Sequence, residues 1–273
     1  MLTAPWVSCV IPFHNDAATL ERAVDSVLDQ GVPVEIILID DASQDASLAM
    51  AQTLARSDAG ITLCRNTENL GAAASRNIAA RRASGDLLCF LDADDQHLPG
   101  FYALACLLLD EHEEWAAIKG GLEFADVPDS YGYDSTDPRH ANVEFSCPGN
   151  LVVRREVFDA LNGFPVDAAF RRRGGGEDVA FMTALTRFFV YFQSVQKVYR
   201  AHDKPGSHLR TFLERTRVVD SRVEWLQSLA EEDDGSMQAA YDRYVATVDI
   251  SRLGTLACAR PLNSVSRQRV AKP

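Results

Sequence analysis

Four short apolar segments alternate with helical patterns over the first hundred residues, and this order restricts the fold more than any other feature of the chain. The apolar segments lie at 7–12, 34–40, 61–66 and 86–92. Runs of this length predict strands, and the continuous ones predict strands covered on both faces. Helical patterns fill the intervals at 17–30, 43–57 and 71–84. The alternation predicts an α/β fold with a parallel sheet and right-handed crossovers.

The second half of the chain has a less regular pattern. We expect helices at 101–112, 155–161 and 179–188, short strands at 150–153 and 190–202, a loop at 126–142, and a turn at 174–178. Residues 207–230 carry four arginines and predict one long amphipathic helix.

The length of the chain is enough for one large domain or for one domain with an appendage. We expect a domain at 1–205. A helical extension and a basic tail would follow at 206–273.

The composition of the chain narrows the range of functions that it could have. The 273 residues carry a formal net charge of -12, which argues against a nucleic-acid partner. An acidic enzyme that handles phosphates would need a metal ion or a local basic patch. The six cysteines include no C-x-x-C pair, which favours a reduced, cytoplasmic protein. The N-terminal segment lacks a basic region and a cleavage site, and no apolar run reaches the ~18–20 residues of a membrane span.

Polar residues follow each of the four expected strands. They lie at 12–15, 40–41, 66–71 and 92–95. Ligands of open parallel sheets bind at the carboxyl ends of the strands, so these four segments should meet at one crevice. No G-x-G-x-x-G and no Walker A sequence follows any strand, so the edge offers acids instead.

The acids Asp92, Asp94 and Asp95 end the fourth strand and contain the one D-x-D triplet of the chain. Carboxylates this close repel one another unless a cation joins them. Mn²⁺ or Mg²⁺ would suit oxygen ligands that leave positions open for phosphate. The alternative is that Asp94 or Asp95 caps the following segment or simply ends the strand.

Two further groups lie at neighbouring strand ends. Asp40 and Asp41 could accept hydrogen bonds from a nucleobase or ribose, or could serve only as turn and cap residues before Ser43. Arg76, in the first turns of the third helix, could steady a diphosphate or could belong to a solvated helix face.

Five motifs in order resemble those of the family 2 inverting glycosyltransferases. The resemblance implies the GT-A fold, with a doubly wound, mixed but mainly parallel sheet that carries helices on both faces. It also implies that the domain at 1–205 consists of a nucleotide-binding half (1–98) and an acceptor half (99–205). The motifs are VIPFHND, IDDAS, NLGAAASRN, FLDADD and GGED, and the resemblance spans roughly residues 5–205. It implies a nucleoside-diphosphate sugar donor, such as a UDP- or GDP-sugar, and an acceptor hydroxyl. The nucleotide-binding residues that it implies are Pro12, Asn15, Asp40, Asp41, Asn69, Gly71, Arg76 and Asp92.

The resemblance also implies individual roles. Asp41 would contact the base and Asp92 the ribose. Asp94, with Asp95 as an auxiliary, would hold Mn²⁺ or Mg²⁺, and His202 would complete the metal shell, with His208 as the second choice. An ordinary polar loop residue is the alternative for His202.

For the acceptor side, the resemblance implies that Asp178 is the general base, with Glu177 as the runner-up. A metal ion would neutralise the leaving diphosphate, and a positioned carboxylate would take the proton of the acceptor hydroxyl. One base and no covalent step predict inversion at the anomeric carbon. The acid cluster and the base must then lie on opposite sides of the sugar.

The chain departs from the family in one respect. It lacks the Q-x-x-R-W segment that marks processive family members, so we expect transfer of a single sugar. The RRRGGGED segment could meet a phosphate-bearing acceptor or could form a solvated loop. The arginines beyond residue 207 allow a weak peripheral contact at the inner face of a membrane, against which the acidic EEDD segment and the net charge count.

Two rival functions remain open at this point. A sugar-phosphate nucleotidyltransferase would be expected to show a Gly- and Arg-rich loop after the first strand, and PFHND differs from that. A catalytically inactive sugar-nucleotide-binding scaffold would not need Asp92, Asp94 and Asp178 together.

Overall fold

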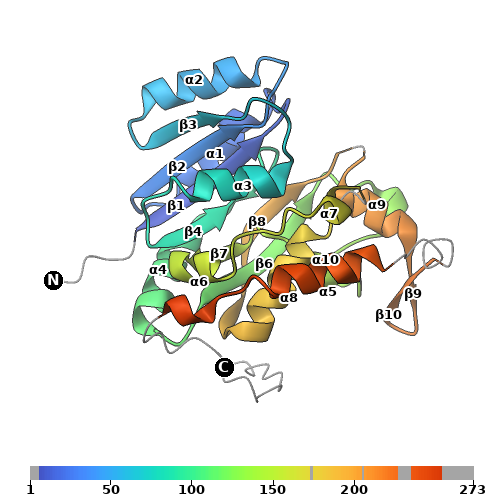
Figure 1. Cartoon of the computed structure of the whole chain (residues 1–273). Helices are drawn as coiled ribbons and strands as arrows, with labels where there is room; N and C mark the ends of the chain where they lie inside the picture. The colour runs from blue at the N-terminus through green and yellow to red at the C-terminus, as the bar shows by residue number, and fades with distance from the viewer. Residues whose placement is uncertain (1–5, 173–174, 205, 227–234, 254–273) are drawn as a thin grey trace.

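The computed structural model describes residues 6–172, 175–204, 206–226 and 235–253, and a mixed sheet forms its centre (Figure 1). The strands of this sheet are β1 (Val7–Phe13), β2 (Val34–Asp40), β3 (Ile61–Arg65), β4 (Leu87–Phe90), β5 (Gln96–His97), β6 (Ala117–Ala125), β7 (Leu151–Arg154) and β8 (Tyr191–His202). The helices are α1 (Leu20–Leu28), α2 (Ser47–Ser57), α3 (Ala72–Ala80), α4 (Phe101–Glu111), α5 (His140–Ser146), α6 (Arg155–Ala160), α7 (Ala168–Arg172), α8 (Glu177–Phe188), α9 (His208–Arg215) and α10 (Ser236–Val245). Short 3₁₀ turns occur at Asp129–Tyr131 and Ile250–Leu253.

The strand order confirms the predicted fold class. The sheet runs β3-β2-β1-β4-β7-β6-β8-β5. Strands β1 to β4 pair in parallel, whereas β7 pairs antiparallel with both β4 and β6. Because β1, β2 and β4 are parallel neighbours, their carboxyl ends lie at one edge, where the polar segments after them meet.

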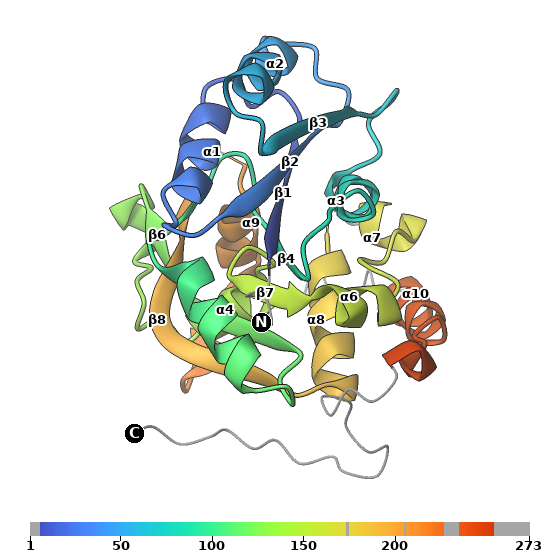
Figure 2. The same ribbon diagram turned by 90° about the vertical axis from the view of Figure 1, so that its left-hand side faces the viewer.

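Helices cover both faces of the sheet (Figure 2). One apolar core lies between the sheet and α1, α2 and α4, and includes Leu20, Val24, Leu54 and Phe101. The other lies beneath α3, α6 and α8. The central strands are apolar throughout because both of their faces are buried, as β1 illustrates with seven buried residues in succession.

The predicted long helix at 207–230 is wrong. Helix α9 ends at Arg215, and the chain then forms the antiparallel hairpin of β9 (Thr216–Val219) and β10 (Arg222–Trp225), which projects from α9 in Figure 1. Asp220 and Ser221 connect the strands with φ values of 47° and 59°. Two left-handed residues in succession give the tight turn that joins twisted strands, and the β-branched residues of 216–223 favour strands over helix. Residues 227–230 lie outside the described part.

The region beyond residue 205 is therefore only partly helical, and it packs on the main domain. Tyr131 donates a hydrogen bond to Glu214, and Arg139 donates one to the carbonyl of Leu213. The basic tail lies outside the described residues. Among the helices that the structure describes, none is both long and apolar enough to cross a membrane.

Candidate active site

The acidic loop at 92–95 follows β4, and its three carboxylates differ in how far they are exposed to solvent. The backbone N–H of Leu91 still bonds to Val10 of β1, and the chain then turns so that the N–H of Asp95 bonds to the carbonyl of Asp92. The side chains of Asp92 and Asp94 are 38% and 22% exposed. Asp95 is buried. Two of the three predicted acids therefore face the edge of the sheet, and the third points inward.

Asp95 joins the acidic loop to the end of β8. One carboxylate oxygen accepts a hydrogen bond from the hydroxyl of Tyr199 (2.5 Å), and the other accepts one from the backbone N–H of His202 (2.7 Å). Burial, together with the charges of Asp94 and Asp92, raises the pKa of Asp95 to about 8. Both oxygens have partners in β8, so Asp95 does not cap the following helix α4, whose start at Gly100 has no side-chain cap.

His202 lies beside the acidic loop, whereas His208 lies elsewhere. The ring nitrogens of His202 are 2.9 Å from Gln96 Oε1 and 3.0 Å from Asp126 Oδ2. His208 lies next to Gly175, in the glycine turn before α8, and its charge affects Asp178. The two candidate histidines thus flank different ends of the site.

A lysine and an arginine hold Asp94. The ammonium of Lys204 is 2.6 Å from Asp94 Oδ2 and 4.0 Å from Asp16. Arg22 donates to the carbonyl of Asp94 at 2.6 Å. Burial lowers the pKa of Lys204, but contact with Asp94 outweighs burial and the net shift is upward. No motif in the sequence pointed to Lys204 or Arg22.

Arg76 connects the acidic loop with the acids of α8. Its guanidinium is buried, donates to the carboxylate of Asp92, and lies over the ring of Phe164. Burial lowers the pKa of Arg76, but the charges of Asp92, Glu177 and Asp178 outweigh burial and raise it. Arg76 therefore belongs to the acidic site, not to a solvated helix face.

Helix α8 begins at Glu177, so both predicted bases lie in its first turn. Gly176 precedes them with φ 102°, a conformation that glycine adopts without strain. Asp178 is half-buried. Burial and the neighbouring Glu177 raise the pKa of Asp178, opposed in part by a backbone hydrogen bond, Arg76 and His208.

The loop after β3 is held by Asp41. Its carboxylate accepts hydrogen bonds from the backbone of Leu70 and Gly71 and from the amide of Asn66, each at 2.8 Å. Gly71 has φ 86° and is the N-cap residue that precedes α3. Asp41 therefore shapes the loop that precedes Arg76.

The remaining predicted nucleotide residues surround this loop. Asp40 is buried, caps the backbone of Ser43 and pairs with Arg65 at 3.0 Å. Asn69 accepts hydrogen bonds from Arg171 at 2.6 and 3.0 Å, which ties α7 to the loop. Arg171 is the one arginine of RRRGGGED whose side chain is described.

The first strand contributes two more of the predicted residues. Pro12 is buried in β1 opposite Ile39. Asn15 has φ 62°, and its side-chain oxygen accepts a hydrogen bond from the backbone of Gln44. Both residues therefore lie at the shared edge, beside the ends of β1 and β2.

The acidic loop fits a divalent cation that shares its shell with phosphate. Asp92 and Asp94 offer partly exposed oxygens, and Lys204 shows that Asp94 already attracts a cation. A cation held by one or two carboxylates plus phosphate oxygens is typical of Mg²⁺ sites. Beside the loop, the buried Nε atoms of Arg22 and Arg76 have no hydrogen-bond partner within the described ranges, which suits an anionic ligand.

Three other metal-capable side chains lie together in the core. Cys9, Cys89 and His97 place their ligand atoms within 4.8 Å of one another, and among the described residues they form the one group of three or more to do so. The ring of His97 already bonds to Tyr102 at 2.6 Å and to the carbonyl of Gly149 at 2.7 Å. The group therefore forms part of the hydrogen-bonded core.

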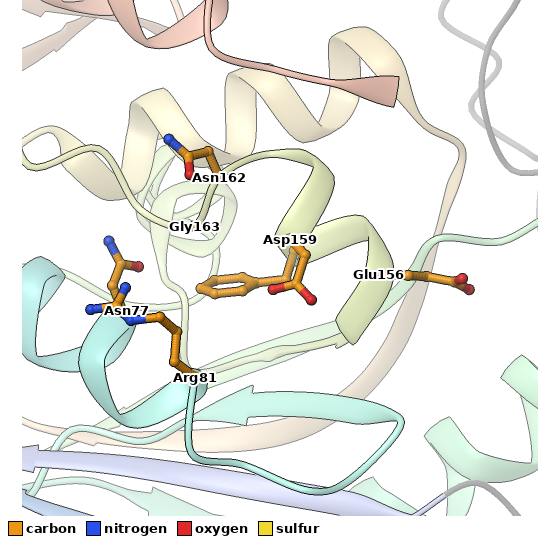
Figure 3. Close-up of a pocket in the computed structure, with 7 residues that line it drawn as sticks. Asn77, Arg81, Glu156, Asp159, Asn162 and Gly163 are labelled. Atoms are coloured by element: carbon orange, nitrogen blue, oxygen red, sulfur yellow. The ribbon is translucent and has the colours of Figure 1, made fainter. Parts of the chain in front are cut away.

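A cavity of about 380 Å³ lies away from the acidic loop, between α3 and α6 (Figure 3). Asn77 lines it, and bonds to both the N–H and the carbonyl of Phe164. Asn77 of the NLGAAASRN motif thus secures the turn at 162–164. None of the acids of the candidate site lines this cavity.

Comparison with known proteins agrees with this geometry. The model of the family "Glycosyl transferase family 2" matches residues 8–161. The chain belongs to this family. It is a glycosyltransferase with the GT-A fold. The uncharacterized protein MT1568 of Mycobacterium tuberculosis is 41% identical over 81% of this chain and 76% of its own length. The match covers smaller shares of three other curated relatives. It covers 16% of polypeptide N-acetylgalactosaminyltransferase 15 of Homo sapiens, 38% of an uncharacterized glycosyltransferase of Haemophilus influenzae, and 37% of the putative teichuronic acid biosynthesis glycosyltransferase TuaG of Bacillus subtilis.

Two solved structures share the fold. S. aureus TarS 1-349 in complex with UDP-GlcNAc has a TM-score of 0.63 and 18% identity, over 91% of this chain and 68% of the TarS 1-349 chain. The mannosyltransferase PcManGT from Pyrobaculum calidifontis, in complex with GDP-Man and Mn²⁺, has a TM-score of 0.58 and 20% identity, over 94% and 76%. At these identities the likeness extends to the fold alone.

Proposed function

We propose that this glycosyltransferase transfers a single sugar, with inversion and with a divalent metal ion, from a nucleoside-diphosphate sugar to an acceptor hydroxyl. The position of Arg76 carries the proposal. The buried guanidinium of Arg76 donates a hydrogen bond to Asp92, and the charges of Glu177 and Asp178 help to raise its pKa. The acids expected on the donor side and on the acceptor side therefore border one space. The complexes of TarS with UDP-GlcNAc and of PcManGT with GDP-Man and Mn²⁺ support this class of donor.

On the donor side, Asp92 would meet the ribose, and Asp94 would hold Mn²⁺ or Mg²⁺. When bound, the metal ion would act as a Lewis acid that stabilises the negative charge of the departing diphosphate. Asp95 and His202 would support the acidic loop from behind through their mutual hydrogen bond. His202 could reach a metal ion only by giving up Gln96 or Asp126.

On the acceptor side, Asp178 would remove the proton of the attacking hydroxyl. Its half-buried position and the charge of Glu177 raise its pKa, which makes it a better proton acceptor than an ordinary aspartate while it is ionised. Glu177 is the alternative base. Its negative charge lies beside Asp178 and contributes to the raised pKa of that carboxyl.

At the nucleotide end, Asp40, Asp41, Asn69 and Gly71 would bind the base and ribose together with Pro12 and Asn15. Both oxygens of Asp41 already accept hydrogen bonds from the loop after β3. A direct contact of Asp41 with the base would therefore replace one of these bonds. Otherwise, Asp41 would act by shaping the loop on which the base lies.

A thermal-shift series with nucleoside diphosphates, with and without Mn²⁺, tests the donor class. A ligand that binds only the folded protein raises its melting temperature by mass action. We expect a selective rise with UDP or GDP that Mn²⁺ increases. If no nucleoside diphosphate changes the melting temperature, the proposed donor site is wrong. Binding without donor turnover, in any acceptor mixture, would favour the inactive scaffold.

A further inference from the structure

Lys204 places a positive charge on the carboxylate that the proposed metal ion would use. Its ammonium lies 2.6 Å from Asp94 Oδ2 and 4.0 Å from Asp16 Oδ1. The neighbouring Arg22 binds the backbone carbonyl of Asp94 and leaves the carboxylate to the lysine. Lys204 is thus the cationic partner of the Asp94 side chain in the described part of the chain.

The backbone around Lys204 is anchored on both sides, while the side chain is largely exposed. On one side, the backbone of His202 bonds to Asp95. On the other, Asp203 pairs with Arg210 at 2.6 Å and accepts a hydrogen bond from Ser207. The Lys204 side chain is 56% exposed. Its flexible four-carbon stem can move the ammonium by several ångströms without any change in the anchored backbone.

We propose that Lys204 is an exchangeable counter-ion of the donor site, which neutralises Asp94 in the free protein and binds the donor's diphosphate after a divalent cation has displaced it. This inference rests on the proposed function, because it assumes that the donor carries a diphosphate. It assigns Lys204 a role in binding the donor, although Lys204 belongs to none of the sequence motifs.

The physical argument is competition for one carboxylate. A cation that coordinates Asp94 must remove the ammonium from Oδ2, so the ion pair with Lys204 weakens the binding of the metal to the free protein. Any two ligands that exclude each other weaken each other equally. A donor diphosphate adds negative charge at the same place, and gives the displaced ammonium a new partner. Metal and diphosphate should therefore bind cooperatively.

Direct binding measurements on Lys204→Met test the exchange. Titration of the free protein with Mn²⁺, followed by the EPR signal of unbound Mn²⁺, should show affinity about three- to fivefold higher in the variant, the size expected for an exposed ion pair. Lys204→Arg should stay near the wild-type value. Arg56→Met is the matched control for charge, because the Arg56 guanidinium contacts Thr53 of its own helix α2, and it should leave Mn²⁺ affinity unchanged.

The second measurement is calorimetry with UDP and GDP at a Mn²⁺ concentration that saturates both proteins. With the metal bound, Lys204→Met should bind the nucleoside diphosphate about fivefold more weakly than wild type, and the difference should shrink at high salt. Unchanged or weaker Mn²⁺ binding in Lys204→Met, or no Mn²⁺ binding by either protein, overturns the exchange. Unchanged nucleotide affinity overturns the diphosphate contact. If wild type binds neither nucleotide, the proposed donor class is wrong, while the Mn²⁺ titration still decides the exchange.

Discussion

Arg76 on α3 and Asp92 at the end of β4 form an ion pair in which the arginine is buried and the aspartate is partly exposed. The pair lies between the metal-binding loop proposed here and the acids of α8. Because a buried guanidinium keeps its charge, Arg76 is a fixed positive point at the centre of an acidic site. Its contact with the ring of Phe164 holds it there.

Arg76→Met should impair both stability and donor binding. Removing one member of a buried pair costs several kcal/mol, but Asp92 can turn to water, so we expect the free energy of unfolding to fall by about 1–3 kcal/mol. Nucleoside-diphosphate affinity should fall by at least about tenfold. Urea unfolding and calorimetry measure the two effects. Arg81→Met, on the exposed end of the same helical segment, should change neither, and equal effects of the two variants would contradict the assignment.

Asp178→Asn should abolish transfer while leaving the donor bound. Loss of a general base lowers the rate of the chemical step by about 10²–10⁴-fold. The donor's Kd should change little, since we propose that Asp178 acts on the acceptor hydroxyl. Glu177→Gln is the matched comparison, and should lower the rate less. Steady-state rates with a competent acceptor decide between them, and a larger loss in Glu177→Gln would transfer the base role to Glu177.

Tyr199→Phe should destabilise the connection between β8 and the acidic loop. The substitution leaves one oxygen of the buried Asp95 without its donor, and a buried unsatisfied group costs about 1–3 kcal/mol. Chemical denaturation measures the change. Tyr241→Phe removes the same atom from a half-buried position in α10 and should be nearly neutral. Equal stability of wild type and Tyr199→Phe would show that the Asp95 contact contributes little.

Lys119 should make the stability of the protein depend on pH. It is fully buried in β6, where its ammonium bonds to Asn150 and to the carbonyl of Cys147, and burial lowers its pKa to about 8. Between that value and the unfolded value of about 10.5, the unfolded chain binds more protons. The stability of wild type relative to Lys119→Met should therefore rise with pH.

The expected rise is about 2 kcal/mol between pH 7.5 and pH 10. Urea unfolding of both proteins at the two pH values gives the difference directly, because the other titrating groups are common to both. A difference that stays constant, or that falls as pH increases, would contradict the lowered pKa of Lys119.

Ser221→Gly should stabilise the β9–β10 hairpin. Ser221 has φ 59°, and follows Asp220 at φ 47° in the two-residue turn. Asp-Gly is the preferred sequence for such a turn, so we expect a gain of about 0.5–1 kcal/mol in the free energy of unfolding. Thermal unfolding measures it. Ala49→Gly, on the exposed face of α2, should have the opposite sign, with a loss of about 1 kcal/mol.

Most strands of the sheet could be predicted from the sequence, because local hydrophobic patterns determine where these strands form. The continuous apolar runs that became β1, β2 and β4 could be recognised from composition and length alone. The expected helix at 179–188 appeared with its start moved to Glu177. The hairpin at 216–225 was missed because its arginine spacing imitates an amphipathic helix. The β-branched residues of 216–223, the left-handed pair at 220–221 and the packing on α9 distinguish the hairpin from a helix.

The candidate site also has features that the sequence alone could predict and features that depend on long-range contacts. By itself the sequence determined that acids follow the second and fourth strands, and the α/β pattern predicted that these strands end at one edge. The structure confirms this, because β2 and β4 both pair in parallel with β1. The tertiary structure decided which acids are available. Asp95 turned inward because Tyr199, 104 residues away, offers it a buried donor. Lys204 reached Asp94 because β8 ends beside the acidic loop, and such long-range contacts leave no periodic signal in a sequence.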